Sequence, residues 1–306
     1  MLNAKTQNLF FATLAVTPQK TQKYYFAIGE IHLLNKSDIQ QLMRKFNFHP
    51  KRRLGQNFLI DKNILRKIIE VTELKQGDVI LEIGPGLGAL TEELVKRVKN
   101  VIAVELDKKL CQILKESLKC HGNVEIIQGD IRKFSFSAYR QDRFTVIGNL
   151  PYYITTPVIV YLLQQRDYIS SILITVQKEV AKRLVAKPGK KDYGAITCFV
   201  RYYANPSILF YIKRASFWPQ PEVDSAFIKL EPSKKPAADV LDEELFFKII
   251  RAAFQKRRKI ILNALRDIIS KERLLEIFKN MGIDPKRRGE TLSLEEFARI
   301  ANQCIG

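Results

Sequence analysis

The chain has 306 residues, of which 46% are apolar and 27% charged, so it can bury a sizeable core and is not disordered throughout. A length of this size favours two domains. Its 51 Lys and Arg against 32 Asp and Glu leave a net charge of +19, which attracts nucleic acid first and an anionic membrane surface second.

The four cysteines lie far apart, and with only three histidines they form no zinc framework. We therefore expect reduced thiols, no metal and a cytoplasmic location. The longest charge-free stretch, 144–165, has the length of a membrane span, but Asn149, Pro151 and Pro157 interrupt it. Lipid would leave these polar and backbone groups unsatisfied, so we expect no contact with membranes.

The first 45 or so residues carry no clear hydrophobic period, and the first 60 contain nine Lys and Arg against two acids. The apolar run 9–16 follows a single Lys5 and falls short of a signal peptide, while the lack of Arg before Arg44 argues against a transit peptide. We expect residues 1–37 to form a flexible basic extension, with globular patterning from Asp38 onward.

Between Asp61 and about Glu231, short β-branched runs alternate with amphipathic stretches, which is typical of a parallel sheet wrapped by helices. Asp61 is a candidate N-cap, an apolar helical stripe runs from Leu90 to Val98, and Pro157 lies in the first turn of a further helix. Residues 38–232 are therefore predicted to form an α/β, doubly wound, seven-stranded Rossmann-like sheet. The predicted strands are 79–83, 101–105, 124–127, 144–149, 171–176, 207–212 and 226–230.

After Pro232 the composition changes to a linker of Lys, Pro and Ala over 233–238, and the chain beyond it has helical patterning. Residues 245–254 carry one apolar face, and Ser293 with Glu296 makes a capping box flanked by Leu292 and Phe297. We expect residues 233–306 to form a small all-helical RNA-binding domain.

A Gly-rich turn, from Gly84 to Ala89, follows the first predicted strand directly and precedes a helix. Gly84 and Gly86 let the backbone turn sharply and let a ligand approach closely. Glu105 ends the next strand, where a carboxylate can accept both hydroxyls of a ribose. This pairing predicts a nucleoside site, but it also fits the dinucleotide pattern of NAD enzymes.

Two acids favour S-adenosylmethionine over NAD. Glu82, just before the turn, is placed to face the cationic methionine end of that donor. Asp130, which follows the third predicted strand, is placed to accept a hydrogen bond from an adenine amino group. Together with Glu105 they predict a methyl-donor pocket.

The fourth predicted strand ends in Asn149-Leu150-Pro151-Tyr152, at the sheet edge where open α/β folds bind ligands. An exocyclic adenine amine is a poor nucleophile because its lone pair is delocalised into the ring. If the Asn149 side-chain oxygen and the Leu150 carbonyl both accept from this amine, its nitrogen becomes more tetrahedral and its lone pair can point at the donor methyl. Pro151 would fix the backbone, so positioning carries the step without a base of shifted pKa.

An adenine taken from folded RNA must be swung out and held between rings. Tyr152 offers one ring, and Phe217, on the Pro-stiffened loop 217–221, is the candidate for the other. We therefore expect Asn149, Leu150, Pro151, Tyr152 and Phe217 to make up the catalytic site.

At this point the chain resembles the ribosomal RNA adenine N6-dimethyltransferases, most closely those that act on the small subunit. The resemblance extends from about Asp38 to the C-terminus, and the joint order of its motifs is highly specific. The motifs are LGQNFL at 54–59, EIGPGLG at 82–88, GD at 129–130, NLPY at 149–152, FWPQPEVDSA at 217–226 and RGETLS at 288–293. The N-terminal extension departs from the family pattern.

The resemblance implies transfer of two methyl groups from S-adenosylmethionine to N6 of each of two adjacent adenosines near the 3′ end of small-subunit (16S) rRNA. The substrate would be a pre-30S particle, and we expect the protein to be a monomer. The resemblance also implies which residues line the donor pocket: Asn57, Leu59, Gly84, Glu105, Asp130 and Asn149. We add Gln56, Leu106 and Ile131, which are neighbours of these residues in the sequence.

Four basic clusters stand out, and we expect them to contact RNA phosphates, which position an RNA but do not select a base. They are 51–53, Lys187 with Lys190 and Lys191, 256–259, and 286–288.

The nearest alternative is the related large-subunit (23S) rRNA methyltransferase that confers macrolide resistance. A different class is a non-catalytic assembly or transcription factor that has kept the fold, against which Asn149 and Tyr152 argue. An NAD-dependent enzyme is the most distant possibility.

Overall fold

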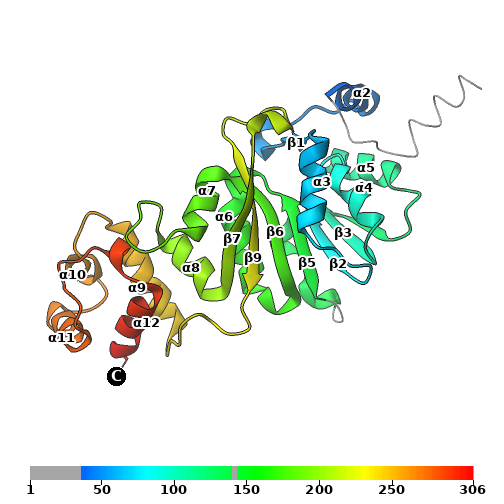
Figure 1. Cartoon of the computed structure of the whole chain (residues 1–306). Coiled ribbons are helices and arrows are strands. Elements are labelled where there is room, and N and C mark those ends of the chain that lie inside the picture. The colour runs from blue at the N-terminus through cyan, green and yellow to red at the C-terminus, as the bar shows by residue number, and fades with distance from the viewer. Residues whose placement is uncertain (1–35, 140–142, 306) are drawn as a thin grey trace, which may run out of the picture.

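The computed structural model describes residues 36–139 and 143–305. The expected extension over 1–37 lies outside them, apart from Lys36 and Ser37, which begin helix α2 (Lys36–Phe46). The sequence pattern did not predict this helix. Its Ile39 is fully buried and packs with Phe48 and with Leu110 of the following domain, so α2 is part of the fold (Figure 1).

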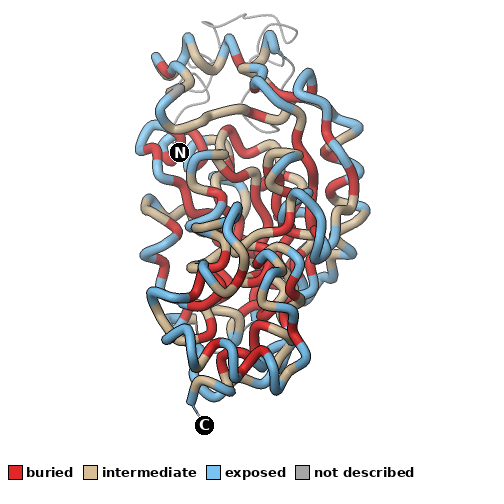
Figure 2. Tube along the Cα trace, turned by 90° about the vertical axis from the view of Figure 1, so that its left-hand side faces the viewer, coloured by how far each residue is buried: buried red, intermediate tan, exposed pale blue. Residues whose placement is uncertain are grey.

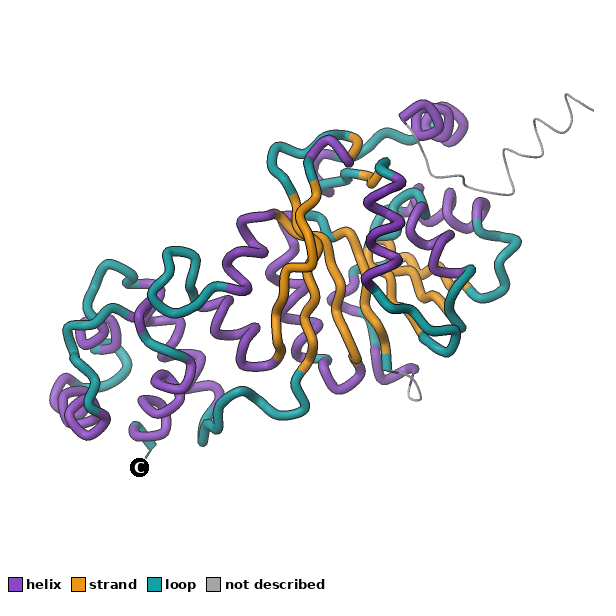
Figure 3. The backbone as a smooth tube through the Cα atoms, in the orientation of Figure 1, coloured by secondary structure: helices purple, strands orange, loops and turns teal. Residues whose placement is uncertain are grey.

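Seven strands form the main sheet, and all seven were predicted, with ends that differ by at most three residues (Figure 3). Their order across the sheet is β4-β3-β2-β5-β6-β9-β7. The strands are β2 (Val79–Ile83), β3 (Asn100–Glu105), β4 (Val124–Gln128), β5 (Phe144–Asn149), β6 (Ile169–Gln177), β7 (Ala204–Ile212) and β9 (Ser225–Pro232).

The sheet is mixed rather than wholly parallel, which corrects the prediction. Strand β9 pairs antiparallel with both β6 and β7, whereas β2 to β6 pair in parallel. A parallel neighbour needs a crossover connection that is usually a helix. The connection 213–224 between β7 and β9 contains no α-helix, so the chain returns in the opposite direction.

Three helices of this part, α3, α4 and α6, were placed individually from the pattern, whereas α5, α7 and α8 were expected only as unplaced helices between strands. Asp61 caps α3 as predicted, its carboxylate accepting from the backbone N–H of Asn63 and Ile64, and Pro157 lies in the first turn of α6. Helix α4 ends at Val95, so Val98 lies beyond it, although Val98 is buried in the same cluster. The helices are α3 (Lys62–Val71), α4 (Ala89–Val95), α5 (Lys108–Ser117), α6 (Thr155–Gln164), α7 (Lys178–Val185) and α8 (Ala195–Tyr203), with 3-10 turns at Arg52–Leu54, Ile131–Lys133, Phe136–Tyr139, Tyr152–Ile154, Arg166–Tyr168, Arg214–Ser216 and Gly289–Thr291.

Both faces of the sheet are covered. Along β2, Leu81 packs in one apolar cluster with Val158 of α6, whereas the adjacent Ile80 packs in a second cluster with Leu94 of α4. Successive side chains of a strand point to opposite faces, so a strand buried on both sides needs apolar residues at every position. This is the physical reason why a central strand such as β2 is almost continuously apolar in the sequence, whereas β4 at the edge of the sheet is not.

A second, two-stranded sheet was not predicted. Strand β1 (Phe58–Leu59) pairs antiparallel with β8 (Phe217–Trp218). The Ile60 N–H also donates to the backbone carbonyl oxygen of Ser216 at 2.9 Å. The pairing brings the segment before α3 onto the loop that follows β7, and strands this short leave no period in a sequence.

Beyond residue 232 the chain is helical, as expected, with the Ser293–Glu296 capping box formed. Its core is continuous with that of the sheet, because the rings of Tyr202 and Tyr203 on α8 pack against those of Phe246 and Phe247 on α9. Buried positions accordingly recur along the trace from the sheet to the C-terminal helices (Figure 2). The helices are α9 (Glu243–Gln255), α10 (Ile261–Leu265), α11 (Lys271–Met281) and α12 (Leu294–Gln303).

Among residues 36–139 and 143–305, no helix has both the length and the apolar character needed to cross a membrane. Within the same ranges, no group of three or more His, Cys, Asp or Glu side chains is arranged to hold a metal ion.

Candidate functional site

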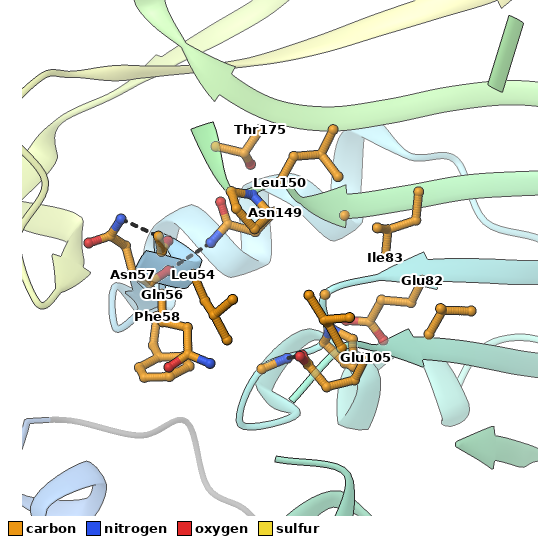
Figure 4. Close-up of a pocket in the computed structure, with 18 of the residues that line it drawn as sticks. Leu54, Gln56, Asn57, Phe58, Glu82, Ile83, Glu105, Asn149, Leu150 and Thr175 are labelled. Atoms are coloured by element: carbon orange, nitrogen blue, oxygen red, sulfur yellow. Dashed lines mark hydrogen bonds between the residues drawn. The ribbon is translucent and has the colours of Figure 1, made fainter. Parts of the chain in front are cut away.

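A cleft with an empty volume of about 1460 Å³, which includes its opening to solvent, lies at the carboxyl edge of β2, β3 and β5 (Figure 4). The segment 54–59 borders it as well. Every residue that the sequence nominated lies in its lining, namely Gln56, Asn57, Leu59, Glu82, Gly84, Gly86, Glu105, Leu106, Asp130, Ile131, Asn149, Leu150, Pro151, Tyr152 and Phe217. The parallel strands explain this convergence for the residues at and after their carboxyl ends, which meet at one edge. The residues of segment 56–59 and Phe217 are brought there instead by the antiparallel pairing of β1 with β8.

The Gly-rich turn is tied to Glu105. Gly84 and Gly86 both have positive φ, +66° and +61°, which disfavours any residue with a Cβ. The Gly86 N–H donates to Glu105 Oε2 at 3.2 Å, and the Asp107 N–H donates to Oε1 at 2.8 Å. The Glu105 carboxylate is therefore held in one orientation, with lone pairs left for the hydroxyls of a ligand.

Glu82 is almost fully buried, and its Oε2 accepts no hydrogen bond. Burial raises the pKa of Glu82 to about 8, and the nearby Glu105 carboxylate acts in the same direction. A buried carboxyl oxygen without a partner is costly, and a cationic ligand would satisfy it. The residues present thus fit a donor whose methionine end carries positive charge.

Asp130 is engaged by its neighbour Arg132. The guanidinium pairs with the carboxylate at 2.6 Å, and the Arg132 backbone N–H donates to Oδ1 at 3.0 Å. The hydrogen bond from the Arg132 side chain holds the pKa of Asp130 below its usual value, so this carboxylate is an anion and an acceptor at neutral pH. Next to it, Ile131 is buried, whereas Leu106 is half exposed in the cleft lining.

Asn149, at the end of β5, has a defined amide orientation. Its Nδ2 donates to the Asn57 backbone oxygen at 2.9 Å, as Figure 4 shows. No described residue donates to Asn149 Oδ1, which leaves this oxygen as an acceptor. The following Leu150 side chain is buried in the core and anchors the backbone that carries the adjacent carbonyl.

Two aromatic rings reach the cleft from different elements. The Tyr152 hydroxyl lies 2.7 Å from the Oγ of Ser225 on β9, and burial raises the pKa of Tyr152, so the hydroxyl stays neutral. Phe217 is buried on β8 and packs in the cluster that contains Ile68 of α3. Both rings are thereby fixed by the scaffold.

Other lining residues were missed. Thr175 of β6 lies in register with Asn149, and Phe227 of β9 is in register with Thr175. Arg132 was also not nominated. No sequence signal points to Thr175 or Phe227, because their place in the cleft depends on which strands are neighbours.

The network beneath Gln56 was missed as well. Gln56 was nominated as a donor contact, yet both ends of its amide are bonded within the protein, to Asp107 and to the Lys51 backbone. From the sequence, Lys51 was singled out only as part of the basic cluster 51–53, and Asp107 was not singled out at all.

Residues 5–305 match the protein family described as ribosomal RNA adenine dimethylase. The chain is 45% identical over 271 residues to the ribosomal RNA small subunit methyltransferase A of Moorella thermoacetica, covering 85% of this chain and 94% of that protein. It is 43% identical over 277 residues to the protein of the same name from Bacillus cytotoxicus, covering 87% and 95%.

Among solved structures, the chain is similar to a dimethyladenosine transferase from Plasmodium falciparum, with a TM-score of 0.68 and 26% identity over 79% of this chain and 95% of that one. It is also similar to the 23S rRNA methyltransferase ErmE, with a TM-score of 0.64 and 25% identity over 82% and 100%. The predicted doubly wound methyltransferase fold is thereby confirmed.

These comparisons also confirm the resemblance and the enzyme class that it implied, an rRNA adenine dimethyltransferase that uses S-adenosylmethionine as methyl donor. The chain belongs to the ribosomal RNA adenine dimethylase family.

Proposed function

We propose that this enzyme methylates N6 of two adjacent adenosines near the 3′ end of small-subunit (16S) rRNA, twice each, within a pre-30S particle. The similarity to proteins named for the small subunit supports this target. The observation that carries the chemistry is the Asn149 amide, whose nitrogen is held by Asn57 while its oxygen is left as an acceptor at the edge of the cleft.

The catalytic step rests on positioning. S-adenosylmethionine, when bound, supplies a methyl group activated by a sulfonium. Asn149 Oδ1 and the Leu150 carbonyl accept hydrogen bonds from the target amine, so its lone pair is less delocalised into the ring and points at the methyl. The N–C bond forms as the S–C bond breaks, S-adenosylhomocysteine leaves, and the proton lost from the methylated nitrogen passes to the solvent at the open side of the cleft. Acceptors that the fold already holds in place do not have to reorient during the reaction. Most of their effect on the rate comes from avoiding this cost of reorganisation.

Three carboxylates hold the donor in this proposal. Glu82 pairs with its cationic methionine end, Glu105 with its ribose hydroxyls, and Asp130 with its adenine amine. Gly84 and Gly86 allow the close approach, while Asn57, Leu59 and Ile131 complete the walls. Leu106, which follows Glu105 at the end of β3, also lines the cleft, and its side chain is half exposed.

The target adenine would be held by Tyr152 and Phe217. The Ser225 contact fixes the edge of the Tyr152 ring, and the core packing of Phe217 fixes the other ring. Each stacked base contributes about 1–3 kcal/mol in comparable proteins, which offsets the cost of extruding the nucleotide.

The fold brings three of the four basic clusters together. The Gly189 N–H donates to the backbone oxygen of Glu290 at 2.7 Å. The Arg257 guanidinium pairs with the Glu290 carboxylate and also donates to the backbone oxygen of Lys191. A bridge between Ile260, which follows the cluster 256–259, and Arg288 brings in the third cluster, 286–288. We call the result the basic junction; its exposed cations without an ion pair in the described chain are Lys187, Lys190, Lys191, Arg258, Lys259, Lys286 and Arg288.

The basic junction lies between α8 and the C-terminal helices, so its unpaired charge is available to RNA phosphates on one surface. The helical region 233–306 would in this way position the rRNA, and the methyltransferase region 38–232 would modify it. Lys51, from the fourth cluster, is instead committed to a 2.7 Å ion pair with Asp107.

The monomeric state and the cytoplasmic location expected from the sequence belong to this proposal, and all four cysteines are free thiols. No feature of the described chain favours large-subunit RNA as the target.

The test is methyl transfer from labelled donor to small subunits that lack the adenine methylations, with large subunits offered in a parallel reaction. We expect label at two adjacent adenosines of 16S rRNA as N6,N6-dimethyladenosine, and none in 23S rRNA. Asn149→Ala should lower turnover about 10²–10³-fold, the usual effect of removing one preorganised hydrogen-bonding group, while donor affinity by calorimetry is retained. Label in 23S rRNA would refute the target, and near-normal turnover of the variant would refute the role of Asn149.

A further inference from the structure

A buried carboxylate, outside the cleft lining, holds the segment 51–57. Asp107 is 3% exposed, and its Oδ2 accepts from Lys51 Nζ at 2.7 Å and from Gln56 Nε2 at 3.1 Å. The Gln56 Oε1 accepts in turn from the Lys51 backbone N–H at 2.7 Å. Lys51 and Gln56 therefore close a loop on one anchor, and neither end of the Gln56 amide is left for a ligand.

The same anchor touches the donor end of the cleft. The Asp107 N–H donates to Glu105 Oε1 at 2.8 Å, and Asp107 Oδ1 accepts from the Lys109 N–H at 2.9 Å as the N-cap of α5. One residue thus fixes the helix, the segment 51–57 and the carboxylate proposed to bind the ribose.

The far end of the segment touches the acceptor side. The Asn57 oxygen accepts from Asn149 Nδ2 at 2.9 Å. Gly55, with φ +58°, lies so close to the catalytic loop that an added Cβ would come within 3.3 Å of Pro151 Cβ. Figure 4 shows Gln56, Asn57 and Asn149 along this side of the cleft.

We propose that Lys51, Gln56 and Asp107 are positioning residues that transmit the fixed geometry of the donor end, through segment 51–57, to the Asn149 amide. The inference rests on the proposed function of Asn149. An amide presents either its oxygen or its nitrogen to a ligand, and the Asn57 carbonyl selects the orientation in which the oxygen faces the target. If the segment moves, that selection is lost, and small displacements at a reacting centre cost large factors in rate.

Lys51→Met tests this, because it removes the ammonium and keeps a long side chain away from the cleft lining. We expect kcat to fall about 10- to 100-fold. The affinity for S-adenosylhomocysteine, measured by calorimetry, should change less than about threefold, since Glu105 keeps its own backbone donors. Lys51→Arg, which preserves the pairing with a carboxylate, should recover most of the activity.

Lys45→Met is the matched control. Lys45, on helix α2, forms an exposed ion pair with Glu116 of α5, with 2.9 Å between Nζ and Oε1. The substitution removes this pair without touching segment 51–57, so kcat should be unchanged. Equal losses in the two variants, or a loss of donor affinity as large as the loss of kcat in Lys51→Met, would overturn the inference.

A double-mutant cycle decides whether Lys51 acts through Asn149. Single-turnover rates over hours are measured for Lys51→Met, Asn149→Ala and the double variant. The inference requires the double variant to be as slow as Asn149→Ala alone, whereas losses that multiply would overturn it. If Asn149→Ala itself turned over normally, the proposed role of Asn149 would fail, and the Lys51 inference with it.

Discussion

The Tyr152 hydroxyl lies 2.7 Å from the Oγ of Ser225, a residue that is fully buried on β9. This contact crosses from the loop after β5 to a strand two positions away in the sheet. It holds the Tyr152 ring at the border of the cleft, so the ring does not have to be ordered when a base arrives. Preorganisation of this kind lowers the entropic cost of binding.

Substitutions at Tyr152 should separate the ring from the hydroxyl. Tyr152→Ala removes the stacking surface and should lower kcat/KM for the ribosomal substrate about 10- to 100-fold. Tyr152→Phe keeps the ring and removes one hydrogen bond, so we expect a decrease of less than about tenfold. Steady-state assays with small subunits measure both, and a larger decrease for Phe than for Ala would contradict the stacking role.

The binding of S-adenosylmethionine should depend on pH through Glu82. Because burial raises the pKa of Glu82 to about 8, this carboxyl is protonated in the free protein at neutral pH and must ionise to pair with a cation. Affinity should therefore increase as pH rises toward 8, by up to about tenfold per pH unit, with release of a proton.

Calorimetry in two buffers of different ionisation enthalpy measures that proton. Glu82→Gln cannot ionise, so its affinity should be weaker and should change less with pH between 6 and 8 than the affinity of the wild type, with only the titration of Glu105 left to contribute. A pH dependence in the variant as steep as in the wild type would assign the proton to another group, with Glu105, whose pKa burial raises to about 7, as the first candidate.

RNA binding should respond to salt through the basic junction. Replacing Arg258 and Lys259 by Gln should weaken binding and reduce the log–log salt slope by about 0.7–0.9 for each phosphate that is no longer neutralised. The matched control, Lys115→Gln with Lys119→Gln, removes the same charge near the end of α5, at the opposite side of the molecule (Figure 1). Filter binding at several salt concentrations compares them, and equal slopes in the two variants would exclude the junction as the RNA-binding surface.

The packing of the C-terminal helices should be sensitive at Gly289. A Cβ added there would lie 2.8 Å from the Ala253 Cβ and 3.1 Å from the Ala253 oxygen on α9. Gly289→Ala should therefore lower the free energy of unfolding by about 1–3 kcal/mol. Gly122→Ala meets no atom within 4 Å and should change it little. Thermal or denaturant unfolding of the two variants compares their free energies of unfolding. Equal effects would contradict the prediction, because they would mean that α9 accommodates the added methyl group without loss of stability.

Much of the fold could be predicted from the sequence, because the signals were local. The apolar runs of β2 and β5, the Asp61 cap and the Ser293–Glu296 box each concern residues within a few positions of one another. The reversed direction of β9 and the pairing of β1 with β8 could not, since both depend on strands far apart in the chain.

The sequence by itself determined the chemistry of the cleft: the order of its motifs indicated the family, and the types of side chain at the strand ends indicated a donor pocket and an amide acceptor. Only the tertiary structure decided how these groups are held. Lys51 to Asp107, Asn57 to Asn149 and Tyr152 to Ser225 are contacts between residues 56, 92 and 73 positions apart, which no local pattern encodes. They exist because folding stacks the carboxyl ends of the strands at one edge and lays the segment before α3 across it.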